Sequence, residues 1–497
     1  MTRHKAQTQF LMALGDEATS HLWGDTSVPK GRTASFFYDE APAELSPAEF
    51  KAKPEERKAR LEAAAAAANA ISSASNQEWL RANAHAASAP VRLKNAKVKL
   101  GNEALVEDLR YTNLLRGKRI GLITNNTGID SHFVSTIDKL TRIRGCKLTA
   151  LFAPEHGIRG AQGAGEKVDT EIDPITSVPV YSLHGTDAKK RAQNKPRPSM
   201  LKDVDTLVYD IQDIGNRSYT YAGTMKLCMQ AAAENGKEFV VLDRPTPMGG
   251  KLISGNVLDP DFVTLVGWAP VAYIYGMTPG EMARMLNDKG QMGLKLTVIP
   301  MKGWKRGMKW WDTGLPWIPT STHMQTPEAC WHIAITGTLG ELNSVSEGVG
   351  YPLPFAYVGA PWIESQRLAN ELNSRKLPGL YFRPAYFKPY YGIFKDKQCG
   401  GVEIHLLDFD KVMPVEAGMH IIEALQKMYP EQKILLGGAD AESTKTRARV
   451  SAFNKVMGGK SVRRALLEGK PAAEIIKSWA PEREKFAKER EKYLLYR

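Results

Sequence analysis

The sequence predicts an α/β protein built on a doubly wound parallel sheet, with a smaller α+β domain after it and a helical extension before it. Two observations support this prediction. From about residue 94 onward, short apolar runs alternate with helical segments, which is typical of buried parallel strands joined by right-handed crossovers. The composition and the pattern of apolar residues also change near residues 94 and 350, and these changes divide the 497 residues into three parts.

The predicted strands are five apolar runs. They are RIGLIT (119–124), KLTALFA (147–153), TLVYDI (206–211), FVVLD (239–243) and LKLTVI (294–299). The segments STIDKLTRI and AGTMKLCMQAAAENG lie between them and look helical, and Gly236 closes the second in the manner of a helix C-cap. We therefore expect strands and helices to alternate in one layered domain over residues 94–350.

The two ends of the chain differ from this central part. Residues 1–93 include a segment of high helix propensity after Pro54 and then many small residues, so we expect a helical or partly disordered N-terminal extension. Residues 351–497 contain an aromatic, proline-rich stretch at 381–393, then the strand-like segment CGGVEIHLLD and two helical segments. This pattern predicts the smaller α+β domain.

Composition and charge narrow the class of protein. No run of about 18 apolar residues occurs, which argues against an integral membrane segment, and the first residues lack the apolar core of a secretion signal. The four cysteines form no CxxC pair, so neither a zinc site nor a disulfide framework is expected. The net charge of +13 is accompanied by no RNA-binding aromatic signature or recognition helix, so we expect no nucleic-acid partner.

A polar motif follows each of the first four predicted strands. The motifs are NNTGID (125–130), PEHGIRG (154–160), QDIGNRSYTY (212–221) and DRPTPMGG (243–250). Because the carboxyl ends of parallel strands share one edge of a sheet, we expect these four loops to meet in one crevice. Asn125, which begins the first loop, is therefore a candidate substrate-binding residue.

The second motif holds the main candidate for catalysis. Glu155 and His156 follow the strand directly, beside glycines that let a ligand approach the backbone. A carboxylate at this place can act as a general acid or base. The alternative is that Glu155 caps the next helix or pairs with Arg159. We expect Glu155 to be catalytic, and His156 and Arg159 to contact the substrate.

The third motif and the residue before it combine carboxylates, a guanidinium and aromatic rings. These groups suit a sugar, because rings stack on its apolar face while charged groups bind its hydroxyls or a carboxylate. The alternative is that the carboxylate of Asp210 caps the following loop and the tyrosines pack in the core. We expect Asp213 to take part in catalysis, and Asp210, Arg217 and Tyr219 to bind the substrate.

A later glycine-flanked loop supplies a second carboxylate, Glu347, with Asn343 as a further substrate-binding candidate. Two carboxyl groups flanking the scissile bond are what glycoside hydrolysis generally requires. Other site classes lack their signatures. The glycines near Lys167 do not complete a P-loop, no GxGxxG follows the first strand, and the histidines lack metal-ligand spacing. We therefore expect neither a metal nor another cofactor.

The succession of motifs resembles one family, the NamZ-type exo-β-N-acetylmuramidases. The motifs are GKRIGLITNNTGID, LFAPEHGIRG, PVYSLHG, VDTLVYDIQDIGNRSYTY, VVLDRPTPMGG, SGNVLDPDF, YGMTPGEMA, NSVSEGVG and GAPW, and the resemblance extends to the closing KYLLYR. It implies a Rossmann-like catalytic domain with a smaller C-terminal domain. It also implies release of N-acetylmuramic acid from the non-reducing ends of peptidoglycan fragments, without a nucleotide cofactor.

The resemblance also assigns roles to residues. Glu155 matches the glutamate of the family's PEHG motif and is the first choice for the catalytic acid/base. Asp213, Arg217 and Tyr219 match the segment after the third strand. Glu347 matches the glutamate of the later loop. The cation for the lactyl carboxylate of the substrate would be Arg159 or Arg217.

The chain departs from the family pattern close to the expected site. Asn126 stands where the family usually has proline, and Ser321, Thr322, His323 and Met324 replace its SPNM. Val349 and Tyr351 replace an arginine and a threonine. We expect these changes to affect the choice of glycan more than the class of reaction.

Several alternatives stay open from the sequence. The main alternative to the glycosidase described above is a non-catalytic cell-wall saccharide-binding protein built on the same crevice. A nucleic-acid binder that uses the net charge of +13 and a metal-dependent hydrolase are further alternatives, and no motif supports either. For the enzyme, a retaining, an inverting and a substrate-assisted mechanism are all compatible with the residues. The family's substrate indicates a periplasmic or secreted protein, whereas the start of the chain shows no export signal and leaves a cytoplasmic location open. The oligomeric state is not encoded in any feature that we recognise.

Overall fold

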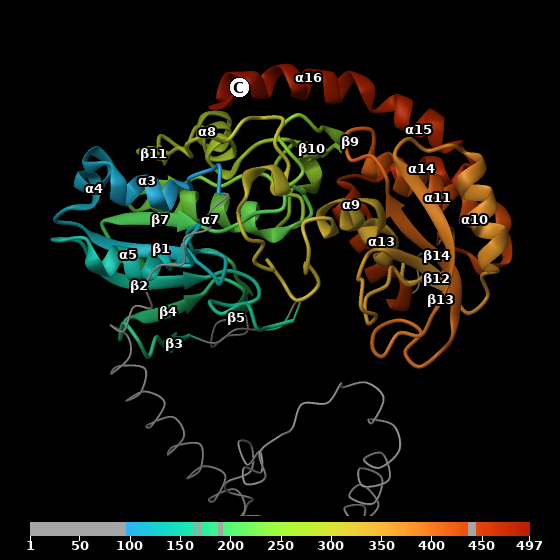
Figure 1. Ribbon diagram of the computed structural model, residues 1–497, viewed down its shortest axis with the longest axis horizontal. Helices are drawn as coiled ribbons and strands as arrows, with labels where there is room; N and C mark the ends of the chain where they lie inside the picture. Colours follow the sequence, from blue (N-terminus) through green and yellow to red (C-terminus); the bar gives the residue numbers. More distant parts are fainter. Residues whose placement is uncertain (1–95, 164–165, 167–169, 187–191, 436–443) are drawn as a thin grey trace, which may run out of the picture. The chain divides into compact units, whose positions relative to one another are not determined.

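The computed structural model describes residues 96–497 except 164–165, 167–169, 187–191 and 436–443. The predicted N-terminal extension, residues 1–93, lies outside these described residues. The centre of the protein is a seven-stranded sheet in which all strands are parallel except the edge strand β3 (Figure 1). Its order is β11 (Leu296–Ile299), β8 (Glu238–Leu242), β7 (Thr206–Asp210), β1 (Arg119–Thr124), β2 (Lys147–Ala153), β4 (Pro179–Ser182) and β3 (Glu171–Ile172).

Helices cover both faces of this sheet. Along β7, Leu207 and Tyr209 point into one apolar cluster and Val208 points into another, as alternation along a strand requires. The first cluster includes side chains of α7 (Thr220–Glu234) and α8 (Pro279–Lys289). The second includes α3 (Gly101–Glu107), α4 (Leu109–Leu115) and α5 (Thr136–Arg142). The predicted α/β sheet with helices on both faces is therefore confirmed.

Local signals in the sequence fix the ends of several helices. Ser135 caps α5 by accepting a hydrogen bond from the amide of Asp138. Thr278 and Glu281 form a capping box at the start of α8, with a proline at its first position. Gly236 has a φ of 62° just after α7, so the predicted glycine C-cap is confirmed.

The chain changes direction at β1. It first adds β2 and β4 on one side of β1, and then returns to add β7, β8 and β11 on the other side. The loops after β1 and β7 therefore leave in opposite directions from neighbouring strands, which is the place where open α/β sheets form a crevice. The same part of the chain contains several short strands and helices outside this order: β5 (Gly185–Thr186), β6 (Ala192–Gln193), α6 (Pro198–Leu201), β9 (Ser254–Val257), η2 (Pro260–Phe262), β10 (Ala272–Ile274) and η3 (Trp310–Thr313).

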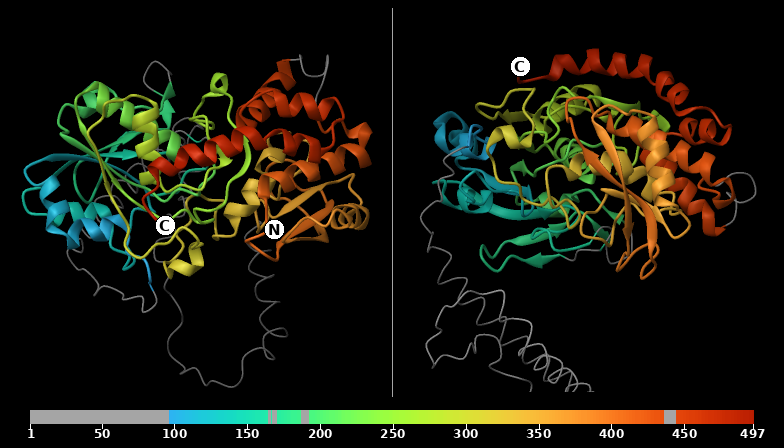
Figure 2. Two further views of the ribbon diagram at one scale, coloured as in Figure 1. Left: turned by 90° about the horizontal axis from the view of Figure 1, so that it is seen from above. Right: turned by 45° about the vertical axis from the view of Figure 1, so that its right-hand side comes forward.

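A separate three-stranded antiparallel sheet follows in the chain, with the order β12 (Tyr357–Ala360), β14 (Cys399–Leu406), β13 (Leu380–Phe387). The proline-rich stretch that we did not assign to a strand contributes β13. Pro384 is tolerated there because β13 is an edge strand. The helices are α9 (Ala329–Gly340), α10 (Ser365–Ser374), α11 (Pro414–Met428), η4 (Pro430–Gln432), α13 (Thr444–Met457), α14 (Ser461–Leu467), α15 (Ala472–Ser478), α16 (Ala480–Arg490) and η5 (Glu491–Tyr493) (Figure 2).

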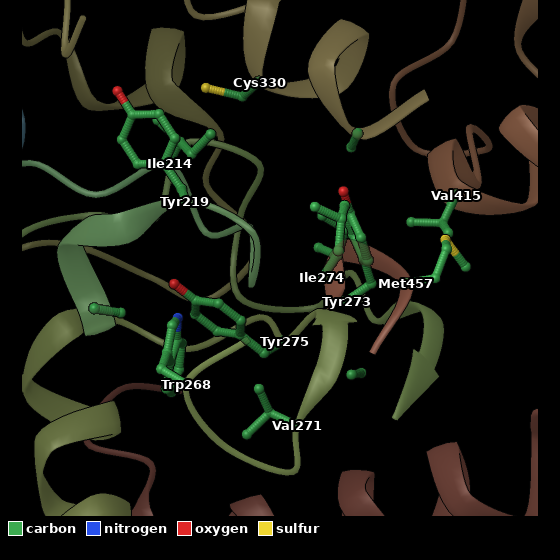
Figure 3. Packing of buried hydrophobic residues seen from close by; sticks show 14 of the residues in the cluster. Ile214, Tyr219, Trp268, Val271, Tyr273, Ile274, Tyr275, Cys330, Val415 and Met457 are labelled. Carbon is green, nitrogen blue, oxygen red and sulfur yellow. The ribbon is translucent and has the colours of Figure 1, made fainter. Parts of the chain in front are cut away.

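The two sheets share one apolar core. Figure 3 shows Val415 of α11 and Met457 of α13 beside Tyr273 and Ile274 of β10, and all four belong to the same buried cluster. The end of the chain also returns to the first part, since Arg490 donates hydrogen bonds to three carbonyl groups of residues 250, 275 and 276. These contacts hold the two sheets in a fixed relation.

Within the part of the chain that the structure describes, no helix combines the length and apolarity needed to cross a membrane. All four cysteines have free thiols. The described residues contain no group of three or more histidine, cysteine, aspartate or glutamate side chains placed to hold a metal ion.

Candidate active site

The four loops that follow β1, β2, β7 and β8 meet at the carboxyl edge of the sheet. Thr127, in the first loop, accepts a hydrogen bond from the amide of Gln212 in the third. The side chain of Gln212 in turn donates to the carbonyl of Pro245 in the fourth loop. The second loop joins them through Glu155, which accepts a hydrogen bond from Thr220. The expected convergence is confirmed.

Glu155 is placed by a tight turn at the end of β2. His156 and Gly157 both adopt left-handed backbone conformations, with φ values of 70° and 75°. The turn presents the carboxylate to the first residue of α7, where the hydroxyl of Thr220 lies 2.7 Å from Oε2. His184 Nε2 lies 3.6 Å from Oε1. The side chain is 13% exposed, so this carboxylate is oriented and still accessible.

His156 is a buried neighbour of that carboxylate. Its Nδ1 lies 2.8 Å from the carbonyl oxygen of Gln162. A carbonyl only accepts, so Nδ1 is the donor in this hydrogen bond. The ring meets that of Tyr221 edge-on at 6.5 Å. The hydrogen bond of His156 thus stiffens the turn that carries Glu155.

Glu347 lies in the loop after α9 and is partly buried. A Cβ atom added to Gly340 would approach its carboxyl carbon to 3.0 Å, which shows how closely the side chain packs on the helix end. Burial, and secondarily the nearby carboxylate of Glu341, raises the pKa of Glu347 to about 7. Glu347 also lies near enough to Tyr391 to raise the pKa of that phenol.

Asp213 is more deeply buried than the two glutamates, at 5% exposure. Its Oδ1 accepts hydrogen bonds from the amide of Gly215 at 2.7 Å and from the hydroxyl of Tyr275 at 2.8 Å. Its Oδ2 has no hydrogen-bond partner among the described residues. Burial raises the pKa of Asp213 to about 6. This carboxyl group lies behind the loops rather than at their surface.

Asn125 and Tyr219 help to hold a fifth loop, which begins at Thr320. The amide of Asn125 donates to the hydroxyl of Tyr221, and that hydroxyl donates to the carbonyl of Thr320. The hydroxyl of Tyr219 lies 2.9 Å from the side-chain oxygen of Thr320. The rings of Tyr219 and Tyr221 meet edge-on at 4.9 Å. Their hydrogen bonds to Thr320 position the loop that carries His323.

Two predicted substrate-binding residues are instead structural. Asp210 is completely buried and forms a bidentate ion pair with Arg244. Arg217 is also completely buried and donates to the carbonyls of residues 256, 271, 456 and 457. Interior partners already hold both charges, so the structure places neither of them toward the crevice where we expected them to meet a substrate.

Two others lie outside this polar cluster. Arg159 is half-exposed and pairs with the buried carboxylate of Asp173 at 2.6 Å. The alternative that Glu155 pairs with Arg159 is not what the structure shows, since the guanidinium of Arg159 is paired with Asp173. Asn343 is exposed and has a φ of 50° just after α9, a conformation that asparagine tolerates at helix ends.

A cleft of about 470 Å³ opens beside this cluster. It is lined by Gly163, Thr322, His323, Gln325, Tyr351, Pro354, Tyr390 and Tyr391. Gly163 follows Gln162, whose carbonyl binds His156 next to Glu155, and the amide of Tyr390 donates to the carbonyl of Gly350, three residues after Glu347. His323 and Tyr391 themselves are joined by a hydrogen bond. The cleft therefore connects the surroundings of the two candidate glutamates.

Comparison with known proteins identifies the family. Residues 120–328 match the N-terminal model, and residues 334–496 the C-terminal model, of the exo-β-N-acetylmuramidase NamZ. The chain belongs to the NamZ family. It is 41% identical over 415 residues to the peptidoglycan β-N-acetylmuramidase NamZ of Bacillus subtilis strain 168, which covers 84% of this chain and 95% of that protein. The resemblance inferred from the motifs is confirmed.

Solved structures of the DUF1343 family from Bacteroides fragilis have the same architecture as this NamZ family member. One is 40% identical, with a TM-score of 0.73, and the match covers 81% of this chain and all of the other. A second is 28% identical, with a TM-score of 0.61, and covers 80% of this chain and 99% of the other.

Sequence reasoning did not single out several residues that lie at this candidate site. His184 follows β4, a strand of four residues that we had not assigned, although PVYSLHG was among the motifs that resemble the family. His323 appeared only as a departure from the family pattern, and Tyr391 only as part of an aromatic stretch. The signal for Tyr391 was an unusual density of exposed tyrosines, which include Tyr386 and Tyr390.

Proposed function

We propose that this protein is an exo-acting β-N-acetylmuramidase, a glycoside hydrolase that releases N-acetylmuramic acid from the non-reducing ends of peptidoglycan fragments. Membership of the NamZ family and the similarity to the Bacillus enzyme support this function. The structural observation that carries it is that one cleft is lined from the loops of two partly buried carboxyl groups: Gly163 comes from the loop of Glu155, and Tyr390 is hydrogen-bonded to Gly350 in the loop of Glu347. Paired carboxyl groups are the usual machinery of glycoside hydrolysis.

The surroundings of the two glutamates favour different roles. Glu347 has a pKa near 7 because of burial, so it holds a proton near neutral pH and acts as the general acid on the leaving oxygen. Glu155 accepts a hydrogen bond at the positive end of α7, so it acts as the base or nucleophile. This assignment reverses the expectation from the sequence, in which Glu155 was the first choice for the acid.

The buried Asp213 supports the reaction from a distance. Its contacts with Gly215 and Tyr275 hold the loop between β7 and α7, and that loop leads to Thr220 beside Glu155. We therefore assign Asp213 a positioning role. In this proposal the substrate's own acetamido group remains an alternative to a protein nucleophile.

The experiment is an assay of N-acetylmuramic acid release from a defined disaccharide with this sugar at the non-reducing end. Glu155→Gln and Glu347→Gln are each expected to lower kcat by at least 100-fold, the range lost with a general acid or base. Asp138→Asn, a change in the first turn of α5, is the control and retains activity. Tight binding of the disaccharide without turnover by the unaltered protein would favour the binding-protein alternative instead.

Two finer assignments belong to the same proposal. The first assignment is that the sheet is Rossmann-like. It is supported by the order of the parallel strands, which is β4, β2, β1, β7, β8 and β11, and by the change of direction beside β1. The protein acts in the periplasm or as a secreted protein, because its substrate class lies outside the cytoplasm. Fractionation of the source cells followed by detection with a specific antibody tests this location, and confinement to the cytoplasm would contradict it.

A further inference from the structure

The cleft beside the two glutamates is built from uncharged side chains. Among the described residues that line it, none is an aspartate, glutamate, lysine or arginine. Burial, and secondarily the nearby His156, lowers the pKa of His323, so this ring is neutral at pH 7. Tyr391 is neutral as well, because burial raises the pKa of its phenol. A ligand carboxylate would lose hydration here without gaining a positive partner from the described lining, and the carboxylate of Glu166, which accepts a hydrogen bond from the amide of Gly163, would repel it.

Two tyrosines give the cleft an exposed aromatic wall. Tyr390 and Tyr391 are 58% and 41% exposed, and their rings lie 5.5 Å apart with a tilt of 59°. Large aromatic side chains that remain exposed next to a cleft are suited to stacking against the apolar face of a sugar. The lining also offers the hydroxyl of Thr322 and the amide of Gln325, which suit sugar hydroxyls and an acetamido group.

This wall is held in place from both sides. The amide of Tyr390 donates to the carbonyl of Gly350 at 2.8 Å. Gly350 has a φ of 87°, and a Cβ atom there would lie 2.2 Å from the carbonyl oxygen of Tyr391, so only glycine fits. On the other side, the hydroxyl of Tyr391 bonds to His323 Nε2, and the two rings stack with an interplanar angle of 26°.

We propose that this cleft is the binding site for the leaving side of the substrate, and that it accepts an uncharged 2-acetamido sugar. Tyr390 and Tyr391 stack against this sugar, and His323 fixes the position of Tyr391. The inference rests on the proposed function and extends it, since it assigns the part of the substrate that the aromatic cleft recognises. The charged muramic acid unit then lies on the other side of the scissile bond.

The first test compares two substrates with different leaving groups. One is the disaccharide of N-acetylmuramic acid linked to N-acetylglucosamine, and the other is N-acetylmuramyl β-fluoride, whose leaving group is a single atom. Tyr391→Ala and His323→Ala are expected to raise KM for the disaccharide about tenfold, in the range of a lost ring contact. Both variants should lower kcat/KM for the disaccharide at least fivefold more than for the fluoride, which has no sugar to place in the cleft.

Two further variants serve as references. Tyr391→Phe keeps the ring and is expected to hold KM for the disaccharide within threefold. Tyr386→Ala removes a tyrosine that is 65% exposed on β13 and does not line the cleft, so it is expected to change neither substrate's kinetics. An unchanged KM in Tyr391→Ala, or an equal loss on both substrates, would overturn the proposal.

A binding measurement separates this proposal from the proposed function. Calorimetry with free N-acetylglucosamine is expected to show binding to the unaltered protein and at least fivefold weaker binding to Tyr391→Ala. Glucosamine, whose amine is positively charged, should bind at least fivefold more weakly than the acetylated sugar. If the sugar binds in this way but neither substrate is hydrolysed, the cleft assignment stands and the hydrolase function fails. Equal binding by both proteins would contradict the cleft assignment alone.

Discussion

The hydroxyl of Thr220 lies 2.7 Å from Oε2 of Glu155 and joins the start of α7 to the loop after β2. The two residues are 65 positions apart in the chain. The hydrogen bond fixes one carboxylate oxygen, while the other lies 3.6 Å from His184. A base or nucleophile held in this way needs little reorganisation before it reacts.

Removal of this hydrogen bond should therefore impair catalysis more than binding. We expect Thr220→Val to lower kcat about 10-fold with KM changed less than threefold, because the carboxylate loses its orientation. Thr220→Ser keeps the hydroxyl and should retain at least half of the activity. Steady-state kinetics on the disaccharide measure both. A Thr220→Val variant with the kcat of the unaltered protein would show that Glu155 needs no such support.

The pKa of Glu347 predicts the alkaline side of the pH profile. Since the general acid must be protonated and burial raises the pKa of Glu347 to about 7, kcat should fall as the pH rises through about 7. Glu341→Gln removes the neighbouring carboxylate that contributes to this raised pKa, so the fall should move to lower pH. Rates measured between pH 4 and 9 test both statements. A fall that stays in place in Glu341→Gln would contradict the assignment.

The same pKa affects stability in a defined direction. The folded-state pKa of about 7 lies above the ordinary value of 4.5, so between these pH values the native protein holds a proton that the unfolded chain has lost. Stability is therefore lost as the pH rises through this window. The amide of Glu347→Gln does not ionise, so this variant does not lose stability as the pH rises. Its free energy of unfolding should exceed that of the unaltered protein by about 1–3 kcal/mol at pH 8, but not at pH 4. Urea unfolding at both pH values checks the difference.

The buried pair of Asp210 and Arg244 should contribute strongly to stability. Arg244→Met leaves a completely buried carboxylate without its counter-charge, which costs about 3–5 kcal/mol. The matched control is Arg119→Met, which breaks a half-exposed pair with Asp205 that solvent screens, so it should cost much less stability. Denaturant unfolding of both variants measures the contrast. Equal costs would mean that Asp210 gains hydration in the folded variant.

The sequence predicted the features that depend on neighbouring residues. The buried strand β7, the glycine cap of α7 and the position of Glu155 just after β2 follow from local apolar runs and backbone preference, and they were found. Strand β4 has four residues, too few to show a period, and β13 contains Pro384, which argues against a strand unless it lies at an edge.

The site was predictable only in part because long-range partners decide what each charge does. Arg217 is a residue type that often binds anionic or polar ligands. Its guanidinium instead donates hydrogen bonds to the carbonyls of residues 456 and 457, about 240 positions away. His323 and Tyr391, 68 positions apart, form the cleft wall together, and neither has a motif of its own. Local patterns predict which residues are polar and near a strand end, whereas tertiary packing decides which of them face a ligand.

The last residues of the chain provide the final prediction. The hydroxyl of Tyr496 donates to Oδ2 of Asp243 at the end of β8 and accepts a hydrogen bond from the amide of Met301. Tyr496→Phe leaves both buried partners short of a hydrogen bond and should lower the free energy of unfolding by about 1–3 kcal/mol. Leu495→Ala, next to it and 39% exposed, should cost less. Comparable losses in the two variants would mean that the apolar packing of the terminus, rather than the bond to Asp243, holds it on the sheet.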